Sequence, residues 1–170
     1  MEDNYDFSAL KKKKRVNSRA KGSTFERSIA KILNDRFKTT EFSRTPGSGA
    51  FATTHTLPDY LKIYGDLITP LNFRYCIECK KGYNKENLYS LFNYSSDFWK
   101  FVEQCEKDSE KCQKIPMVIF KQDRQKTLAI VPYNIIYISN NYIEIHKEEK
   151  RYKIYLFDDL LKELDSLWLD

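Results

Sequence analysis

Three charged residues, Asp66, Glu78 and Lys80, carry the chemistry that this sequence suggests first. They lie in residues 65–80, where two short runs with strand character flank a turn around Asn72. If a hairpin folds about Asn72, Asp66 lies opposite Glu78, and the two-residue period of a strand places Lys80 on the face of Glu78. Opposed like charges destabilise a sheet, whereas Mg²⁺ binds one or two carboxylates together with phosphate and water. The pattern indicates a cation site; the alternative is an exposed surface ion pair of little energetic value.

A further carboxylate, Glu26, lies near the start of the first predicted helix. Residues 23–26 match a capping box that begins at Ser23, and apolar residues follow at helical spacing. In one interpretation Glu26 reaches back to the Ser23 amide and only caps the helix. In the other, the first helical turn holds Glu26 over the strand face as an additional metal-site carboxylate.

A long segment without a predicted element precedes Asp66. Residues 41–45 predict a short strand, and the nearly twenty residues that follow contain glycines but no helix or strand pattern. Loops of this length in a compact domain are usually functional or disordered. The segment has no Gly-Lys-Ser/Thr and so is not a nucleotide-binding P-loop. Asp59 is an alternative to Asp66, but the hairpin register would place it beyond the strand.

The order of the predicted elements indicates an α/β fold with a mixed central β-sheet flanked by helices on both faces. After the hairpin we expect a long helix from Ser95 or Ser96 to Cys112, strands at residues 115–120 and 127–131, and a hairpin of residues 142–146 and 152–157. A final helix is expected to present one apolar face formed by Leu160, Leu161, Leu164, Leu167 and Trp168.

The length and composition fit one folded domain. The chain has 170 residues, of which 41% are hydrophobic and 15% aromatic. We expect a flexible basic arm at residues 1–20, a core at 21–134, and a C-terminal hairpin and helix packed on that core at 135–170. Neither a long apolar run nor an apolar signal core is present, which predicts an intracellular protein without membrane insertion. Cys76 and Cys79 point to opposite faces of a strand, which argues against a zinc site.

Positive charge is concentrated at the N-terminus. The net charge of the whole chain is +5, and residues 1–21 hold seven basic residues against three acidic ones. The basic residues are Lys11, Lys12, Lys13, Lys14, Arg15, Arg19 and Lys21. A cationic arm on a nearly neutral body suits a polyanionic partner, and nucleic acid is the first candidate. The alternative is a solvated tail that improves solubility.

Taken together, the motifs resemble those of the PD-(D/E)xK, or restriction-endonuclease-like, nucleases. The matching stretches are residues 21–26, residues 44–49, Asp66 and residues 77–80, with Gly65 in place of the proline that usually precedes the aspartate. This combination is similar to archaeal-type Holliday junction resolvases and related phage-encoded nucleases, over about residues 20–131. The resemblance implies a nuclease core at residues 21–134 that hydrolyses DNA phosphodiester bonds with Mg²⁺ or Mn²⁺, in DNA recombination or repair.

The resemblance also implies residue roles. Asp66 and Glu78 would bind the metal, and Glu26 would complete the site directly or through water. Lys80 would orient or deprotonate the attacking water. The resemblance places Ser48 near the scissile phosphate and Gln104 beside the active site. Besides the basic arm, the expected DNA contacts are Arg44, Phe51 and Lys81.

The implied partner is branched DNA, cut by a homodimer in two symmetric strands, without a nucleotide cofactor or a membrane. The expected location is the cytoplasm or nucleoid, or the host cytoplasm for a phage- or virus-encoded protein. Two alternatives stay open: an endonuclease of another specificity, nicking or restriction-like, and a non-catalytic DNA-binding module on the same fold.

Overall fold

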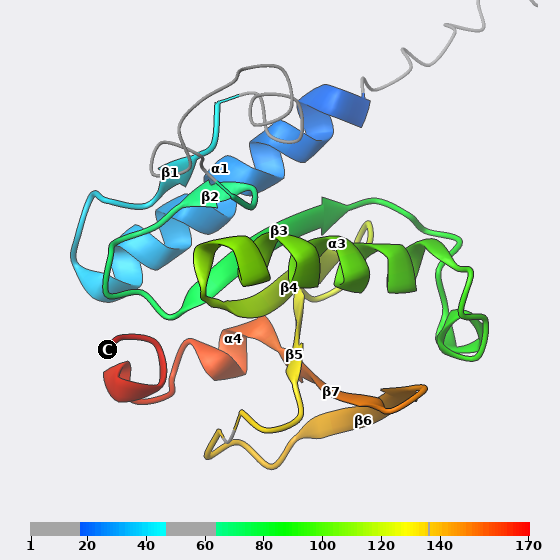
Figure 1. The fold of residues 1–170 in the computed structure, drawn as a ribbon. Coiled ribbons are helices and arrows are strands. Elements are labelled where there is room, and N and C mark those ends of the chain that lie inside the picture. The colour runs from blue at the N-terminus through cyan, green and yellow to red at the C-terminus, as the bar shows by residue number, and fades with distance from the viewer. Residues whose placement is uncertain (1–17, 47–63, 136) are drawn as a thin grey trace, which may run out of the picture.

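The computed structural model describes residues 18–46, 64–135 and 137–170, and Figure 1 shows how their helices and strands are arranged. The elements in chain order are α1 (Ser18–Phe37), β1 (Ser43–Arg44), β2 (Leu67–Ile68), β3 (Tyr75–Lys81), η3 (Leu88–Leu91), α3 (Asp97–Cys112), β4 (Ile115–Lys121), β5 (Leu128–Pro132), β6 (Tyr142–Lys147), β7 (Lys150–Leu156), α4 (Phe157–Leu160) and η4 (Asp165–Leu167).

Five strands form one mixed sheet in the order β3-β4-β5-β7-β6. β3 and β4 are parallel and are connected through α3, whereas the other neighbouring strands are antiparallel. One apolar cluster joins α1 and the C-terminal segment to one face of the sheet, and a second cluster joins α3 to the other face. The predicted α/β fold with a mixed sheet between helices is confirmed, and β3 lies at an edge of that sheet (Figure 1).

Alternation along β3 divides its side chains between these two layers. Tyr75, Ile77 and Cys79 belong to the apolar cluster that contains the buried residues of α1. Glu78 and Lys80 lie on the opposite face, where the Lys80 ammonium reaches α3. The two-residue period of a strand requires this arrangement, and the prediction that Glu78 and Lys80 share a face is confirmed.

The first helix begins earlier than predicted. α1 starts at Ser18, and Ser23 lies inside it, where its hydroxyl donates to the carbonyl of Ala20 at 3.2 Å. The capping-box interpretation of Glu26 is therefore wrong, and residues 18–20 are helical rather than part of a flexible arm. The residues that follow Ser18 include Arg, Ala and Lys, which are strong helix formers and extend the helix backwards. Residues 1–17 lie outside the described residues.

The predicted hairpin between β2 and β3 does not form. β2 pairs instead with β1, antiparallel, in a separate two-stranded sheet. The chain just before β3 already has another partner, because Phe73 forms a bridge with Leu169 and the Arg74 amide donates to the carbonyl of Trp168 at 2.9 Å. The C-terminal residues therefore pair with the chain at the end of the predicted hairpin turn.

The C-terminal helix is also shorter than predicted. Only the short helices α4 and η4 form, and between them the Leu164 side chain is 62% exposed. Arg36 donates to the carbonyls of Leu161 and Glu163 at 2.6 and 2.8 Å, which satisfies acceptors that a continuous helix would use internally. The apolar residues still reach the core, since Trp168 is fully buried.

The hairpin of β6 and β7 extends the main sheet through the pairing of β7 with β5. Among the described residues, no helix combines the length and apolar character that crossing a lipid bilayer requires.

Candidate active site

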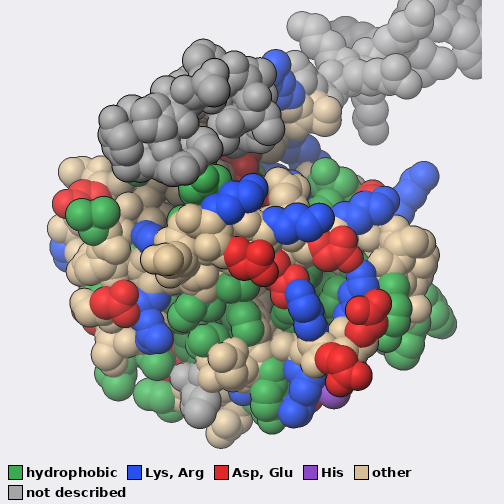
Figure 2. Space-filling view, viewed as in Figure 1, with side chains coloured by type: hydrophobic (Ala, Val, Ile, Leu, Met, Phe, Trp, Pro, Cys, Tyr) green, Lys and Arg blue, Asp and Glu red, His purple; other side chains and the backbone are tan. Residues whose placement is uncertain are grey.

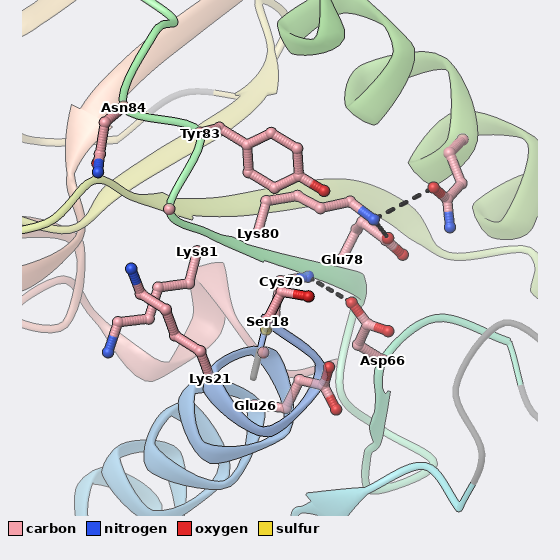
Figure 3. A pocket seen from close by; sticks show the side chains of 13 residues that line it. Ser18, Lys21, Glu26, Asp66, Glu78, Cys79, Lys80, Lys81, Tyr83 and Asn84 are labelled. Carbon is pink, nitrogen blue, oxygen red and sulfur yellow. Dashed lines mark hydrogen bonds and ion pairs between the residues drawn. The ribbon is translucent and has the colours of Figure 1, made fainter. Parts of the chain in front are cut away.

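A cavity of about 620 Å³ opens at the β3 edge of the sheet (Figure 3). Its walls contain seven of the residues singled out from the sequence, namely Lys21, Glu26, Asp66, Glu78, Lys80, Lys81 and Gln104. Because β3 is an edge strand, the cavity receives side chains from both layers of the fold. α1 supplies Glu26 from one face, and α3 supplies Gln104 from the other.

Asp66 is fixed beside β3 through its backbone and its side chain. Its amide donates to the carbonyl of Ile77 at 2.8 Å, and its Oδ2 accepts from the amide of Cys79 at 2.8 Å. Gly65 permits this approach, since it has a φ of +76° and an added Cβ would lie 2.7 Å from the Ile77 oxygen. Asp66 therefore flanks Glu78 as expected, although the two strands do not form the predicted ladder.

Glu78 is a buried carboxylate in an unfavourable environment. It is 2% exposed, and its Oε1 forms an ion pair with the Lys80 ammonium. Burial, and next the charge of Asp66, raise the pKa of Glu78 to about 8 despite the attraction of Lys80. Additional positive charge between Asp66 and Glu78 would stabilise the ionised form.

Lys80 keeps its charge in this site. Its Nζ lies 3.3 Å from Gln104 Oε1 and 5.4 Å from the centre of the Phe101 ring. Burial opposes the charged form, but Glu78 and then Asp66 outweigh it and raise the pKa of Lys80. A protonated ammonium can stabilise a phosphate oxygen or orient a water molecule. In this state it cannot accept a proton, so of its two predicted roles the orienting one fits.

Glu26 is buried in the same cavity, but Arg44 binds it. The Arg44 Nε donates to Glu26 Oε2, and the two side chains are 23% and 10% exposed. The pairing of β1 with β2 brings Arg44 to this place, whereas the sequence suggested separate roles in DNA and metal binding. Within the described ranges, no three acidic, histidine or cysteine side chains are grouped closely enough to hold a metal ion.

The carboxylates of Asp66 and Glu78 nevertheless suit a magnesium ion. Mg²⁺ is commonly held by one or two protein carboxylates, with water and substrate phosphate as its other ligands. The Glu78 carboxylate is buried beside the charge of Asp66, and this environment favours a cation as a further partner.

The other residues predicted to contact DNA lie in different surroundings. Lys21 forms an ion pair with Asp123 at 2.6 Å, Lys81 lies over the Phe25 ring, and Arg19 is exposed on the first turn of α1. The predicted residues Lys11, Lys12, Lys13, Lys14, Arg15, Ser48 and Phe51 lie outside the described residues.

Tyr83 and Asn84 are among the cavity residues that were not predicted (Figure 3). The Tyr83 ring packs on Phe101 with their centroids 4.6 Å apart, and the Asn84 amide donates to Asp123 at 2.9 Å. Only their position in the sequence could have indicated them, because they follow directly after the end of β3 and Gly82. Residues just beyond the end of a strand that carries catalytic candidates are expected at the same edge.

This mixed sheet, with Asp66, Glu78 and Lys80 at its edge, is consistent with the fold of the PD-(D/E)xK nucleases. Within that class, the chain belongs to the family described as "Phage putative PDDEXK endonuclease", whose model matches residues 17–169. It is also 33% identical over 156 residues to Protein D14 of Escherichia phage T5, a match that covers 86% of this chain and 92% of that protein. No solved structure matches this chain significantly.

Proposed function

We propose that this protein is a magnesium-dependent DNA endonuclease whose preferred substrate is the four-way junction. The observation that carries the nuclease proposal is the meeting of Asp66, Glu78 and Lys80 in one cavity of a chain from the PDDEXK endonuclease family. The junction proposal is supported by the similarity of the motifs at residues 21–26, 44–49 and 77–80 to those of Holliday junction resolvases.

Each residue of the site has a separate proposed role in hydrolysis. Asp66 and Glu78 would hold Mg²⁺ or Mn²⁺, which, when bound, activates water and neutralises charge on the phosphate. The Lys80 ammonium binds a phosphate oxygen or orients the attacking water, and Gln104 holds the lysine in position. Glu26 supports the site through water while Arg44 balances its charge. Cutting two symmetric strands of a junction requires two such sites, so we propose a homodimer.

The test incubates the protein with Mg²⁺ and, in parallel, a four-way junction, a linear duplex of the same sequence and a single strand. We expect cleavage of the junction to be fastest and to stop when a chelator is added. Glu78→Ala and Asp66→Asn should abolish cleavage but not DNA binding. Glu149→Ala is the matched control, because Glu149 is exposed in the turn between β6 and β7.

The possible outcomes separate the parts of the proposal. Cleavage that persists in the presence of chelator, or in both variants, would refute the active-site assignment. Equal cleavage of junction and duplex would refute only the junction preference and favour a nicking or restriction-like enzyme. DNA binding without cleavage of any substrate would support a binding module.

Two residues outside the described ranges extend the proposal to junction recognition. Ser48 is expected near the scissile phosphate, and Phe51 could stack on bases exposed at a branch point. Ser48→Ala should therefore reduce cleavage more than binding, and Phe51→Ala should reduce the preference for junctions over duplex. A Phe51→Ala variant with unchanged preference would assign junction recognition elsewhere.

A further inference from the structure

Six of the eight charged residues of α3 form two stripes, and the other two, Asp97 and Asp108, lie beside the basic stripe. Lys100, Lys107 and Lys111 follow a helical spacing of seven and four residues and share one side of the helix with Gln104. Glu103, Glu106 and Glu110 recur every three or four residues on an adjacent side. Basic and acidic residues that simply alternated along the helix would not be separated in this way. Each stripe therefore has contacts of its own.

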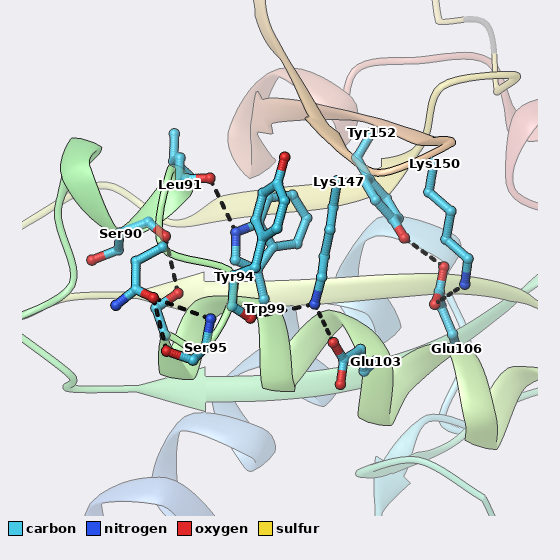
Figure 4. A network of polar contacts seen from close by, with 12 residues as sticks. Ser90, Leu91, Tyr94, Ser95, Trp99, Glu103, Glu106, Lys147, Lys150 and Tyr152 are labelled. Carbon is cyan, nitrogen blue, oxygen red and sulfur yellow. Dashed lines mark hydrogen bonds and ion pairs between the residues drawn. The ribbon is translucent and has the colours of Figure 1, made fainter.

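The acidic stripe has partners within the fold (Figure 4). Lys147 of the β6–β7 hairpin forms an ion pair with Glu103, and Lys150 forms one with Glu106 at 2.7 Å. The Tyr152 hydroxyl also donates to Glu106, at 2.7 Å. These contacts connect α3 to the β6–β7 hairpin and balance the negative charge of Glu103 and Glu106 with lysines of the same chain.

The basic stripe faces solvent beside the catalytic cavity. Lys100, Gln104, Lys107 and Lys111 are all exposed, and Gln104 at the same time lines the cavity and contacts Lys80. In the view that places α3 in front, Lys and Arg side chains follow one another across the surface (Figure 2). The stripe therefore begins on one side of an active-site residue and continues on the other.

Internal ion pairs do not account for this stripe. Lys100 pairs with Asp97 and Lys111 with Asp108, both three residues earlier on the same helix, and both lysine side chains are more than half exposed. Such exposed pairs contribute about 0–1 kcal/mol and exchange readily for another anion. Lys107 forms no ion pair with another residue in the described part of the chain.

We propose that Lys100, Lys107 and Lys111 bind the phosphate backbone of a DNA segment that passes the active site at Gln104. The inference rests on the proposed endonuclease function and adds a binding surface to it. The stripe is about 16 Å long, at 1.5 Å per helical residue, and spans about five nucleotides of one strand at 3.4 Å each. Exposed ammonium groups at this spacing suit a regular row of phosphates and carry no information about sequence.

The test measures binding of a fluorescent four-way junction and of a linear duplex in chelator, where no strand is cut, at several salt concentrations. Removing one lysine–phosphate interaction should reduce the slope of log affinity against log salt by about 0.9 for duplex DNA. The triple variant Lys100→Ala, Lys107→Ala, Lys111→Ala should lower the duplex slope by about 2–3. In cleavage assays its apparent KM should rise more than its kcat falls.

Lys162→Ala provides the matched control. Lys162 is as exposed as the stripe lysines, and it also pairs with an acidic residue three positions earlier, Asp159, but it lies beyond α4. We expect Lys162→Ala to leave the slope unchanged and all variants to keep the melting temperature of the unaltered protein within a few degrees.

An unchanged slope in the triple variant, while the unaltered protein binds and cuts DNA, would overturn this inference and leave the endonuclease proposal intact. A slope reduction of about 0.9 in Lys162→Ala would also overturn it, because net charge alone would then explain the effect. Failure of the unaltered protein to bind or cut any DNA would overturn both proposals.

Discussion

Replacing Glu78 with glutamine should abolish activity and yet make the metal-free protein more stable. Glu78 is 2% exposed, and burial together with the charge of Asp66 raises its pKa from an ordinary value of 4.5 to about 8. The folded state therefore disfavours the carboxylate, even after the attraction of Lys80 is included. Glutamine has nearly the same shape and no charge, so Glu78→Gln removes this penalty.

The magnitude and its pH dependence follow from the shift in pKa. Below pH 4.5 the side chain of Glu78 is protonated in both the folded and unfolded states, and it carries no penalty. As the pH rises from 4.5 towards 8, the unfolded state loses the proton first, so the stability of the folded protein falls. At about 1.4 kcal/mol per pKa unit, the loss of stability reaches about 4 kcal/mol near pH 7.5.

Thermal unfolding in chelator between about pH 4.5 and 8.5 measures this effect. For a domain of this size, about 4 kcal/mol corresponds to about 8–16 °C in melting temperature. Glu78→Gln should therefore melt higher than the unaltered protein at about pH 7.5, and the difference should disappear towards pH 4.5. Added Mg²⁺ should stabilise only the unaltered protein, because it binds the folded site.

Glu163→Gln is the control for a buried carboxylate that the fold satisfies. Glu163 is 5% exposed and accepts from the amides of Ile138 and Ser139 at 3.1 and 2.7 Å. Its replacement should lower the melting temperature, since hydrogen bonds to a charged acceptor contribute about 1.5–3 kcal/mol each. If Glu78→Gln also melted lower near neutral pH without metal, the ion pair with Lys80 would outweigh burial and the reasoning would be refuted.

Three further predictions test the support of the site. Gly65→Ala should destabilise the protein by about 2–3 kcal/mol and reduce cleavage, because the added Cβ meets a backbone oxygen of β3 at positive φ, whereas Gly22→Ala within α1 should be neutral or stabilising; urea denaturation distinguishes them. Arg44→Ala should lower the free energy of unfolding by about 3 kcal/mol, because it leaves buried Glu26 without its ion pair, and a milder effect of Arg44→Lys would confirm a role for the charge. Cys112 should be alkylated by iodoacetamide before the other cysteines at about pH 7.5, because a hydrogen bond with the Cys76 thiol lowers the pKa of Cys112 to about 7. Peptide mass mapping that finds another cysteine alkylated first would contradict this prediction.

Elements with strong internal periodicity were predicted correctly from the sequence. Residues 115–120 and 127–131 are short apolar runs, and they form the buried strands β4 and β5. Ser96 occupies the predicted N-cap position of α3, and a turn at residues 148–149 separates β6 from β7 in the predicted hairpin. These features depend on local propensity and burial, which a single sequence displays directly.

Elements that depend on distant partners were predicted less well. The length of the C-terminal helix is decided by Arg36, which lies 125 residues away from the Leu161 carbonyl that it binds. Likewise, nothing local to Glu26 shows that Arg44, on the short strand β1, will bind it. The apolar and charged residues were identified correctly in both cases, but their contacts require the tertiary structure.

The failed hairpin prediction and the geometry of the candidate site have a common cause. In a continuous hairpin, the amide of Cys79 would be available to a backbone carbonyl of the returning strand. Because β3 instead stays at the edge of the sheet, that amide is bound by the side chain of Asp66 at 2.8 Å. This bond turns the Asp66 carboxylate towards β3 and next to buried Glu78, where their repulsion favours a cation. An edge strand without a full partner is thus the feature that allows an aspartate from one segment and a glutamate from another to form one site.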